Sequence, residues 1–337
     1  MRLRLAAILL IAIPAAAQIQ MQDSHTTAGL RGIFNVDGKI AWASGTNGTI
    51  LRTTDGGTTW TKCAIADTDK LDFRGILAWD SKEALVMSSG PGEASRIFRT
   101  RDGCATWTEL ARSHTKEGFW DAIAFPKFGP GILVGDPING HFETQWISRD
   151  RSRLAPENVC VAEEGEGAFA ASNTSAIAFA TGDALIGTGG KSGARVLQWS
   201  APCLDNCPAK CEGVSVPISF GDSSGIFSLA QRDATHIVAV GGDYKKPNDS
   251  TGTAAFSSDG GHTWTAAKTP PHGYRSAVAW DKQSQLWIAV GTNGSDISRD
   301  DGLTWQPLEN GNWNAISPPF VVGPNGRIGK LEVPPSR

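Results

Sequence analysis

The sequence has no cluster of basic residues, no helical periodicity and, beyond its first 17 residues, no long hydrophobic segment. The formal net charge of the 337 residues is −3 and like charges do not gather in runs. This argues against nucleic acid as a partner, because phosphate binding needs a concentrated basic surface. No later segment is apolar enough to cross a bilayer, so we expect no membrane insertion. A glycine-rich dinucleotide fingerprint and a CxxCH haem site are also missing, so we expect no cofactor.

The first 17 residues are typical of an export signal. Arg2 and Arg4 give a short basic start, Leu5–Ile13 is apolar but too short to span a bilayer, and Ala15–Ala17 offers small residues for cleavage. Cleavage would leave a mature chain that begins near Gln18, with no cysteine there to carry a lipid anchor. We therefore expect a periplasmic or secreted bacterial protein; the alternative is that this stretch forms a buried N-terminal strand.

The even number of cysteines fits an oxidising compartment. The six are Cys63, Cys104, Cys160, Cys203, Cys207 and Cys211. In an exported chain such a set indicates disulfides. We predict one bond between Cys63 and Cys104 and a second between Cys160 and one of the last three. The alternative is a metal site, but it has neither a nearby histidine nor the two-residue cysteine spacing that zinc sites favour, so we expect no metal.

Four copies of an eight-residue stretch organise the chain. They read TTDGGTTW, TRDGCATW, SSDGGHTW and SRDDGLTW. Each places an aspartate five residues before a tryptophan, and the pairs are Asp55 and Trp60, Asp102 and Trp107, Asp259 and Trp264, and Asp300 and Trp305. Aspartate and hydroxyl side chains bind backbone N–H groups of tight turns, and glycine takes their positive φ values. One active site would not need four copies of its acid, so we interpret the stretches as structural turns between strands.

The spacing of these turns predicts an all-β fold, a seven-bladed β-propeller of four-stranded blades. Intervals of 47, 48 and 41 residues separate Asp55 from Asp102, Asp102 from a decayed copy at Asp150, and Asp259 from Asp300. Repeats of about 40–50 residues are typical of propeller blades. We predict one domain over residues 18–337, with blades that start at Leu30–Val36, Phe73–Trp79, Trp120–Phe125, near Phe169, Phe227–Ala230, Tyr274–Trp280 and Trp313–Ile316.

The last predicted blade is one strand short. Gln18–Gln22 alternates between apolar and polar residues and belongs to no other blade. We predict that it supplies the missing outer strand and closes the ring, because closure removes the exposed edges of an open array.

The repeated turn resembles the Asp-box, or BNR repeat, of sialidases and many other propellers. The blade starts Leu30–Ile33, Phe73–Ile76 and Tyr274–Ala277 more closely resemble the bacterial relatives of the photosystem II stability and assembly factors. The resemblance covers nearly all of the mature chain. It implies a seven-bladed propeller that acts as a binding or assembly scaffold.

The variable residue at each blade start marks a candidate binding site. These residues are Arg31, Arg74, Asp121, Ala170, Ser228, Arg275 and Asn314. In a closed ring, Arg275, Asn314, Arg31, Arg74 and Asp121 would form a contiguous polar arc at one channel mouth, with small residues opposite. Three arginines suit carboxylate or phosphate recognition. The alternative is that each arginine caps strand-end carbonyls or pairs with a neighbouring carboxylate.

Loops on the same face add candidates. Asp136 and Asp243 occupy similar positions after the second strands of blades three and five, and Tyr244 follows Asp243. They could belong to a site, although aspartate beside glycine or proline is also a common turn residue.

Two functions fit this pattern. The first is a non-catalytic scaffold, expected to be a monomer, that captures a protein or an anionic ligand. The second is a sialidase-like glycan-active hydrolase or lyase, which needs a tyrosine nucleophile with a carboxylate partner. Only two tyrosines exist. Tyr274 should point away from the side that Arg275 faces, so Tyr244 is the candidate nucleophile, with Glu143 or Glu163 as an unplaced partner. We expect the scaffold.

Overall fold

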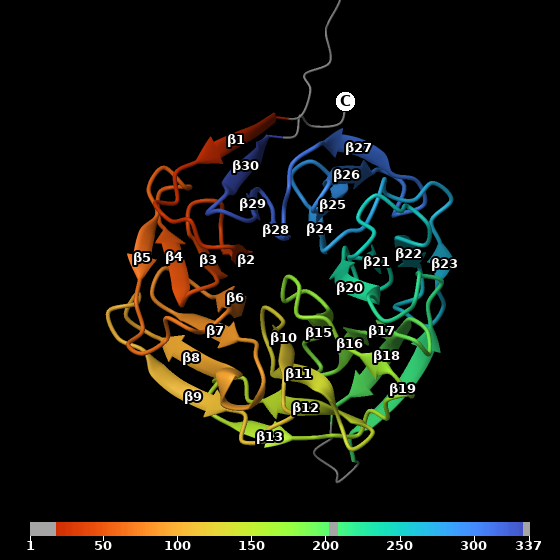
Figure 1. Cartoon of the computed structure of the whole chain (residues 1–337), viewed down its shortest axis with the longest axis horizontal. Helices are drawn as coiled ribbons and strands as arrows, with labels where there is room; N and C mark the ends of the chain where they lie inside the picture. Colours follow the sequence, from red (N-terminus) through yellow and green to blue (C-terminus); the bar gives the residue numbers. More distant parts are fainter. Residues whose placement is uncertain (1–17, 202–207, 333–337) are drawn as a thin grey trace, which may run out of the picture.

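The computed structural model describes residues 18–201 and 208–332, and they form a ring of seven antiparallel sheets around a central channel (Figure 1). The all-β, seven-bladed propeller is thereby confirmed. No helix in this part of the chain is long and apolar enough to span a membrane.

Each blade has four strands, and their order in the sheet leads from the channel to the rim. Blade one comprises β2 (Leu30–Asn35), β3 (Ala41–Gly45), β4 (Thr49–Thr53) and β5 (Thr61–Cys63). Blade two comprises β6 (Phe73–Ala78), β7 (Ala84–Ser88), β8 (Arg96–Thr100) and β9 (Thr108–Arg112), with a short 3-10 helix η1 (Gly92–Ala94). Blade three comprises β10 (Trp120–Ala124), β11 (Gly131–Ile138), β12 (His141–Ile147) and β13 (Leu154–Pro156).

The remaining blades follow the same order. Blade four comprises β15 (Ala176–Ala178), β16 (Ala184–Gly187), β18 (Arg195–Ser200) and β19 (Lys210–Ser215). Blade five comprises β20 (Ser224–Gln231), β21 (Ile237–Asp243), β22 (Ala254–Ser257) and β23 (Thr265–Ala266). Two short strands, β17 (Gly189–Gly190) and β14 (Glu166–Gly167), add to the free edge of β20. Blade six comprises β24 (Ala277–Asp281), β25 (Leu286–Gly291), β26 (Gly294–Ser298) and β27 (Gln306–Glu309).

The seventh blade closes the ring as predicted. It contains β28 (Ala315–Ser317), β29 (Phe320–Val322) and β30 (Ile328–Glu332), and its outer strand is β1 (Gln18–Gln22). β1 pairs antiparallel with β30, so both ends of the described chain meet in one blade (Figure 1). Gln22 also accepts a hydrogen bond from Trp60 Nε1 at 3.0 Å, which joins the closing strand to blade one.

The core lies between the blades. Apolar side chains from facing sheets pack into one cluster at each seam; between blades one and two, for example, Trp42 and Ile50 pack against Phe73 and Val86. Burial of these faces supplies the main driving force for the ring, since apolar surface removed from water stabilises the fold.

The four intact Asp turns share one hydrogen-bond pattern. Asp55 Oδ1 accepts from the Thr59 backbone N–H at 2.9 Å and from the Thr53 hydroxyl at 2.8 Å, and Asp55 Oδ2 accepts from the Thr59 hydroxyl at 2.7 Å. The same set recurs around Asp102, Asp259 and Asp300. These donors, the Thr59 hydroxyl first, lower the pKa of Asp55 to about 2. Each carboxylate is therefore occupied by its own turn.

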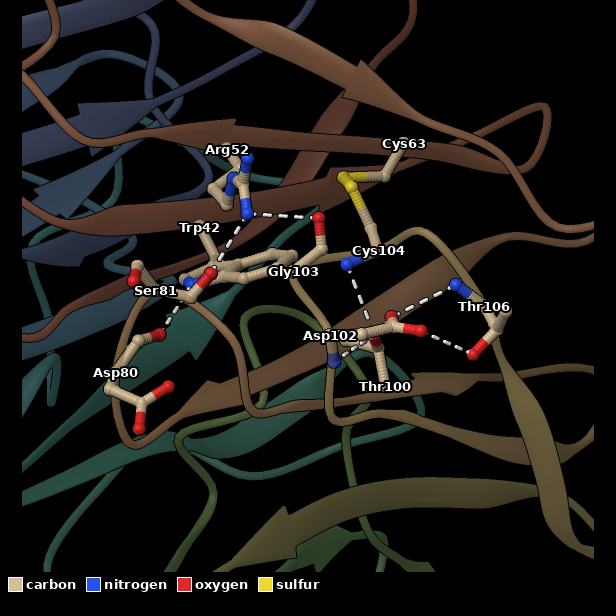
Figure 2. The surroundings of a disulfide bond; sticks show 10 residues. All are labelled: Trp42, Arg52, Cys63, Asp80, Ser81, Thr100, Asp102, Gly103, Cys104 and Thr106. Carbon is tan, nitrogen blue, oxygen red and sulfur yellow. Dashed lines mark hydrogen bonds between the residues drawn. A yellow bond between two sulfur atoms is a disulfide. The ribbon is translucent and has the colours of Figure 1, made fainter.

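Two disulfides cross blade seams. Cys63, at the end of β5, is bonded to Cys104 in the Asp turn of blade two, as predicted (Figure 2). Beside it, Arg52 Nη1 donates to the carbonyls of Ser81 and Gly103, each at 2.8 Å (Figure 2). The second bond joins Cys160 to Cys211 and so links the end of blade three to β19. It matches the prediction, while Cys203, Cys207 and the predicted export signal lie outside the described residues.

The fourth blade begins later than predicted. Its inner strand starts at Ala176, whereas the pattern placed the start near Phe169. The intervening sequence consists mostly of small residues, so it does not mark where the strand begins. Phe169 instead stacks on Phe227, with ring centroids 4.0 Å apart, and the residues after Phe169 form hydrogen bonds to blades three and six.

Candidate functional site

A cavity of about 370 Å³ opens at the channel mouth opposite the Asp turns. The blade starts and the loops between second and third strands surround it. One side carries Arg31 and Arg74, and the other carries aromatic rings, so a ligand there would meet cationic and apolar groups together.

The arginine side is built by two β-bulges. The pairing of β2 with β3 skips Arg31, and that of β6 with β7 skips Arg74. A bulged residue is left out of the strand ladder, and its side chain is re-aimed. Both guanidinium groups consequently line the cavity.

One carboxylate serves both arginines. Asp72 Oδ2 accepts from Arg74 Nε at 2.8 Å, and Asp72 Oδ1 lies 3.9 Å from Arg31 Nε. Arg74 Nη1 also donates to the Ala170 carbonyl at 2.9 Å. Among residues 18–201 and 208–332, Arg31 Nε has no hydrogen-bond partner. Burial lowers the pKa of Arg31, and the Asp72 charge opposes that shift. Because two arginines share one aspartate, this side of the cavity has a net positive charge and N–H donors without partners.

The aromatic side was predicted only at Tyr244; Phe169, Phe227 and Tyr274 were not predicted to line the site. Phe227 meets Tyr274 edge to face at 4.8 Å and Tyr244 at 6.1 Å, and its other face stacks on Phe169. Phe227 is skipped in the pairing of β20 with β21, so it holds in blade five the position that Arg31 holds in blade one. Ser228, the residue predicted for blade five, follows the bulge by one position; it is buried, and its hydroxyl is hydrogen-bonded to that of Thr174.

Arg275 does not reach the cavity. It is fully buried, donates from Nε to Asp296 Oδ2 at 2.7 Å and from Nη1 to Asn293 Oδ1 at 2.6 Å. Its backbone N–H binds the carbonyl of Gly241 in the preceding blade, as that of Leu30 binds Gly323. Arg275 therefore stands at the buried register of Leu30, one residue before the bulge position. The predicted arc of three arginines is reduced to two.

The side chains of Tyr274 and Arg275 do point to opposite sides of the backbone. We expected Arg275 to face the cavity, but Tyr274 does so. Tyr274 lines the cavity, while Arg275 is buried against Asp296 and Asn293. Burial raises the pKa of Tyr274, which makes its phenolate form less accessible. Tyr244 also lines the cavity and is 47% exposed.

The remaining predicted residues divide between cavity and framework. Asn314 lines the cavity, and its side-chain amide donates to the Leu30 carbonyl at 2.7 Å. Asp243 holds a turn, because its Oδ1 accepts from the Ser223 hydroxyl at 2.7 Å and from the Lys245 N–H at 2.9 Å. It is not among the cavity-lining residues.

Asp121 and Asp136 lie in blade three and do not line the cavity. Asp121 is 1% exposed, and burial, followed by the neighbouring Asp136 charge, raises its pKa well above the ordinary range. Burial also raises the pKa of Asp136, whose Oδ1 accepts from the Ala168 N–H at 3.2 Å. No group of three or more His, Cys, Asp or Glu side chains in the described ranges is arranged to hold a metal ion.

A plug, defined as Phe169–Thr174, forms the floor of the cavity. Ser172 Oγ donates to the Ser276 carbonyl at 2.8 Å, and the Asn173 side chain binds the backbone N–H and carbonyl of Ile123 at 2.8 and 3.0 Å. The segment before β15 thus crosses from blade four towards blades three and six (Figure 1). The plug was not predicted, because the sequence pattern placed the first strand of blade four in this segment.

These features define a seven-bladed β-propeller with a two-sided cavity at one mouth. Among solved structures, the chain is similar to YCF48 from Cyanidioschyzon merolae, with a TM-score of 0.65 and 18% identity over 94% of this chain and 99% of that one. It is also similar to YCF48 bound to D1 peptide, with a TM-score of 0.63 and 16% identity over 96% and 100%.

A third similar structure is that of the RRP9 WD40 repeats, with a TM-score of 0.60 and 10% identity over 94% of this chain and 100% of that one. At these identities the likeness shows a YCF48-like propeller fold. No protein-family model matches the chain, and no curated protein matches it.

Proposed function

We propose that this chain is an exported, monomeric binding scaffold that captures a protein partner at the arginine–aromatic cavity. The observation that carries the proposal is the pair Arg31 and Arg74, which share Asp72 and keep donors free, opposite the rings of Phe227, Tyr244 and Tyr274. Arginine forks bind carboxylates, and buried aromatic rings anchor apolar side chains. A peptide with both kinds of group fits this cavity.

The similar structures lend support. One of them is YCF48 bound to D1 peptide, so this propeller fold accommodates a peptide ligand. The two disulfides support export, because such bonds persist in oxidising compartments.

A sialidase-type reaction has less geometric support. Sialidase-type enzymes hold the substrate carboxylate with three arginines. This cavity contains two, and the third, Arg275, is buried and paired with Asp296 of its own blade. Burial also raises the pKa of Tyr274 beside the cavity.

Co-purification tests the proposal. The tagged chain is expressed in the cells that encode it, and captured proteins are identified by mass spectrometry for the wild type and for the double variant Arg31→Ala/Arg74→Ala. We expect a partner that the wild type retains and the double variant loses.

The matched control is Arg299→Ala, which removes an exposed arginine from an Asp turn on the opposite face. It should retain the partner, and all three proteins should have similar melting temperatures. Identical captured proteins in all three samples, or no specific partner for the wild type, would contradict the proposal.

A further inference from the structure

The opposite end of the channel carries a second, apolar groove. Two adjoining cavities of about 320 Å³ each share Phe34, Leu77, Phe125, Pro126 and Lys127 as lining residues. One extends into the channel, and the other extends outward past Trp79. We call the combined surface the Phe125 groove. It lies on the face of the Asp turns, since its loops join first to second strands.

The plug separates this groove from the arginine–aromatic cavity. Phe169, Ala170 and Ala171 line the cavity, whereas Ser172, Asn173 and Thr174 line the groove. The hydrogen bonds of Ser172 and Asn173 to blades six and three fix the plug. One molecule therefore cannot pass through, and the two surfaces are independent sites.

The groove presents aromatic rings to solvent. Trp79 and Phe125 meet edge to face at 5.5 Å, and Phe128, next to the lining residue Lys127, is 64% exposed. Exposed aromatic side chains gathered on one surface are typical of interaction sites. Aromatic-lined grooves of this size hold the large side chains of extended peptides.

The charge of the groove is positive. Of its described lining residues Lys127 is the charged one, and none is a carboxylate. Arg151 stacks on the Trp79 ring at 3.9 Å, so a second cationic side chain lies at the edge of the groove. Charge complementarity therefore favours a ligand that combines apolar and acidic groups.

We propose that the Phe125 groove binds an extended internal segment of a partner protein in which large apolar residues are flanked by acidic ones. The paired cavities accept two side chains, and Lys127 contacts a flanking carboxylate. The chain would then hold two partners at opposite ends of its channel, which extends the scaffold function to a second, independent site.

Selection against the full chain tests the proposal. The probe is a phage-displayed library of twelve-residue segments fused at their C-termini, so that they carry no free terminal carboxylate. The enriched segments are then made as amidated peptides, and their affinities are measured by fluorescence anisotropy. We expect the enriched segments to combine a large apolar residue with a neighbouring Asp or Glu.

Charge reversal separates specific binding from general attraction. Lys127 is exposed, so Lys127→Glu should leave folding intact. It should weaken peptide binding by roughly tenfold or more, because it places a carboxylate next to the acidic residue of the peptide. Exchanging the peptide's acidic residue for Lys should restore binding to this variant. Phe125→Ala should also weaken binding, while the matched charge reversal Lys62→Glu on β5 should not.

Three results would overturn the proposal. The first is no enriched segment, or one whose affinity is unaffected by Lys127→Glu. The second is loss of binding in Arg31→Ala/Arg74→Ala, which would place the peptide at the other mouth. The third is a dimer of the chain that Phe128→Asp converts to a monomer, or an acyl chain found by native mass spectrometry, either of which would identify another occupant. Arg31→Ala/Arg74→Ala should bind these peptides normally. The experiment therefore distinguishes a failure of the Phe125 groove proposal from a failure of the proposal for the arginine–aromatic cavity.

Discussion

The start of blade six and the starts of blades one and two carry the same sequence feature in two different environments. Arg31 and Arg74 occupy bulges and line a cavity, whereas Arg275 stands one residue earlier in register and is enclosed with Asp296. A shift of one residue in a strand moves a side chain to the other face of the sheet. The comparison shows that one arginine belongs to the framework and two belong to the site.

The largest expected effect on stability comes from removing the strand that closes the ring. Deleting residues 18–28 removes β1, the outer strand of blade seven, and the bonds of Gln22 to blade one. We expect a sharp fall in melting temperature by calorimetry, because the deletion exposes the edge of β30. Met21→Gln changes an exposed side chain on the same strand and serves as the control. An unchanged melting temperature for the deletion would show that β1 does not stabilise the closed ring.

Removing Arg275 should have the next largest effect. Arg275→Ala leaves Asp296 buried without its cationic partner, a change that costs about 3–5 kcal/mol of unfolding free energy. Arg31→Ala is the matched variant and should change the unfolding free energy by less than about 0.5 kcal/mol, since it leaves no buried partner of this kind. Denaturant titration measures both. Equal losses would remove the distinction between framework and site arginines.

Two aspartates should give smaller effects of opposite pH dependence. Asp55 has a pKa of about 2 against an ordinary 3.8, so its turn contributes stability above about pH 4 and loses it as the pH falls towards 2. Burial raises the pKa of Asp121, so stability is lost as the pH rises above its ordinary value of 3.8.

We therefore expect Asp121→Asn to raise the melting temperature at pH 7 and to have little effect at pH 3. Asp55→Asn should lower the melting temperature at pH 7 and have little effect near pH 2. Thermal unfolding at several pH values measures both variants. A lower melting temperature for Asp121→Asn at pH 7 would show that the buried carboxyl is needed for packing.

Local turn chemistry made the fold predictable. The Asp turns fix strand ends through bonds within eight residues, and the alternation of Gln18–Gln22 was enough to predict the closing strand. Both disulfide predictions also hold, because neighbouring blades place cysteines of adjacent repeats side by side.

The site was only partly predictable because it depends on register. Arg31, Arg74, Asn314 and Tyr244 were identified, but nothing in the local sequence distinguishes a bulged arginine from one a residue earlier, as Arg275 shows. Phe169 and Phe227 read as ordinary aromatic strand residues. Their contact joins the plug to blade five, and repeat spacing does not specify it.

The positions of the two disulfides predict which seams between blades separate first. Cys63–Cys104 links blade one to blade two, and Cys160–Cys211 links blade three to blade four. Within the described chain, the seam between blades two and three and the seams from blade four through blade seven to blade one have no such link, and they include the seam beside the closing strand. Under pulling force or heat these seams should separate first, while blades one and two stay joined. A partner held by Arg31 and Arg74 would then remain on blades one and two, the pair that Cys63–Cys104 joins.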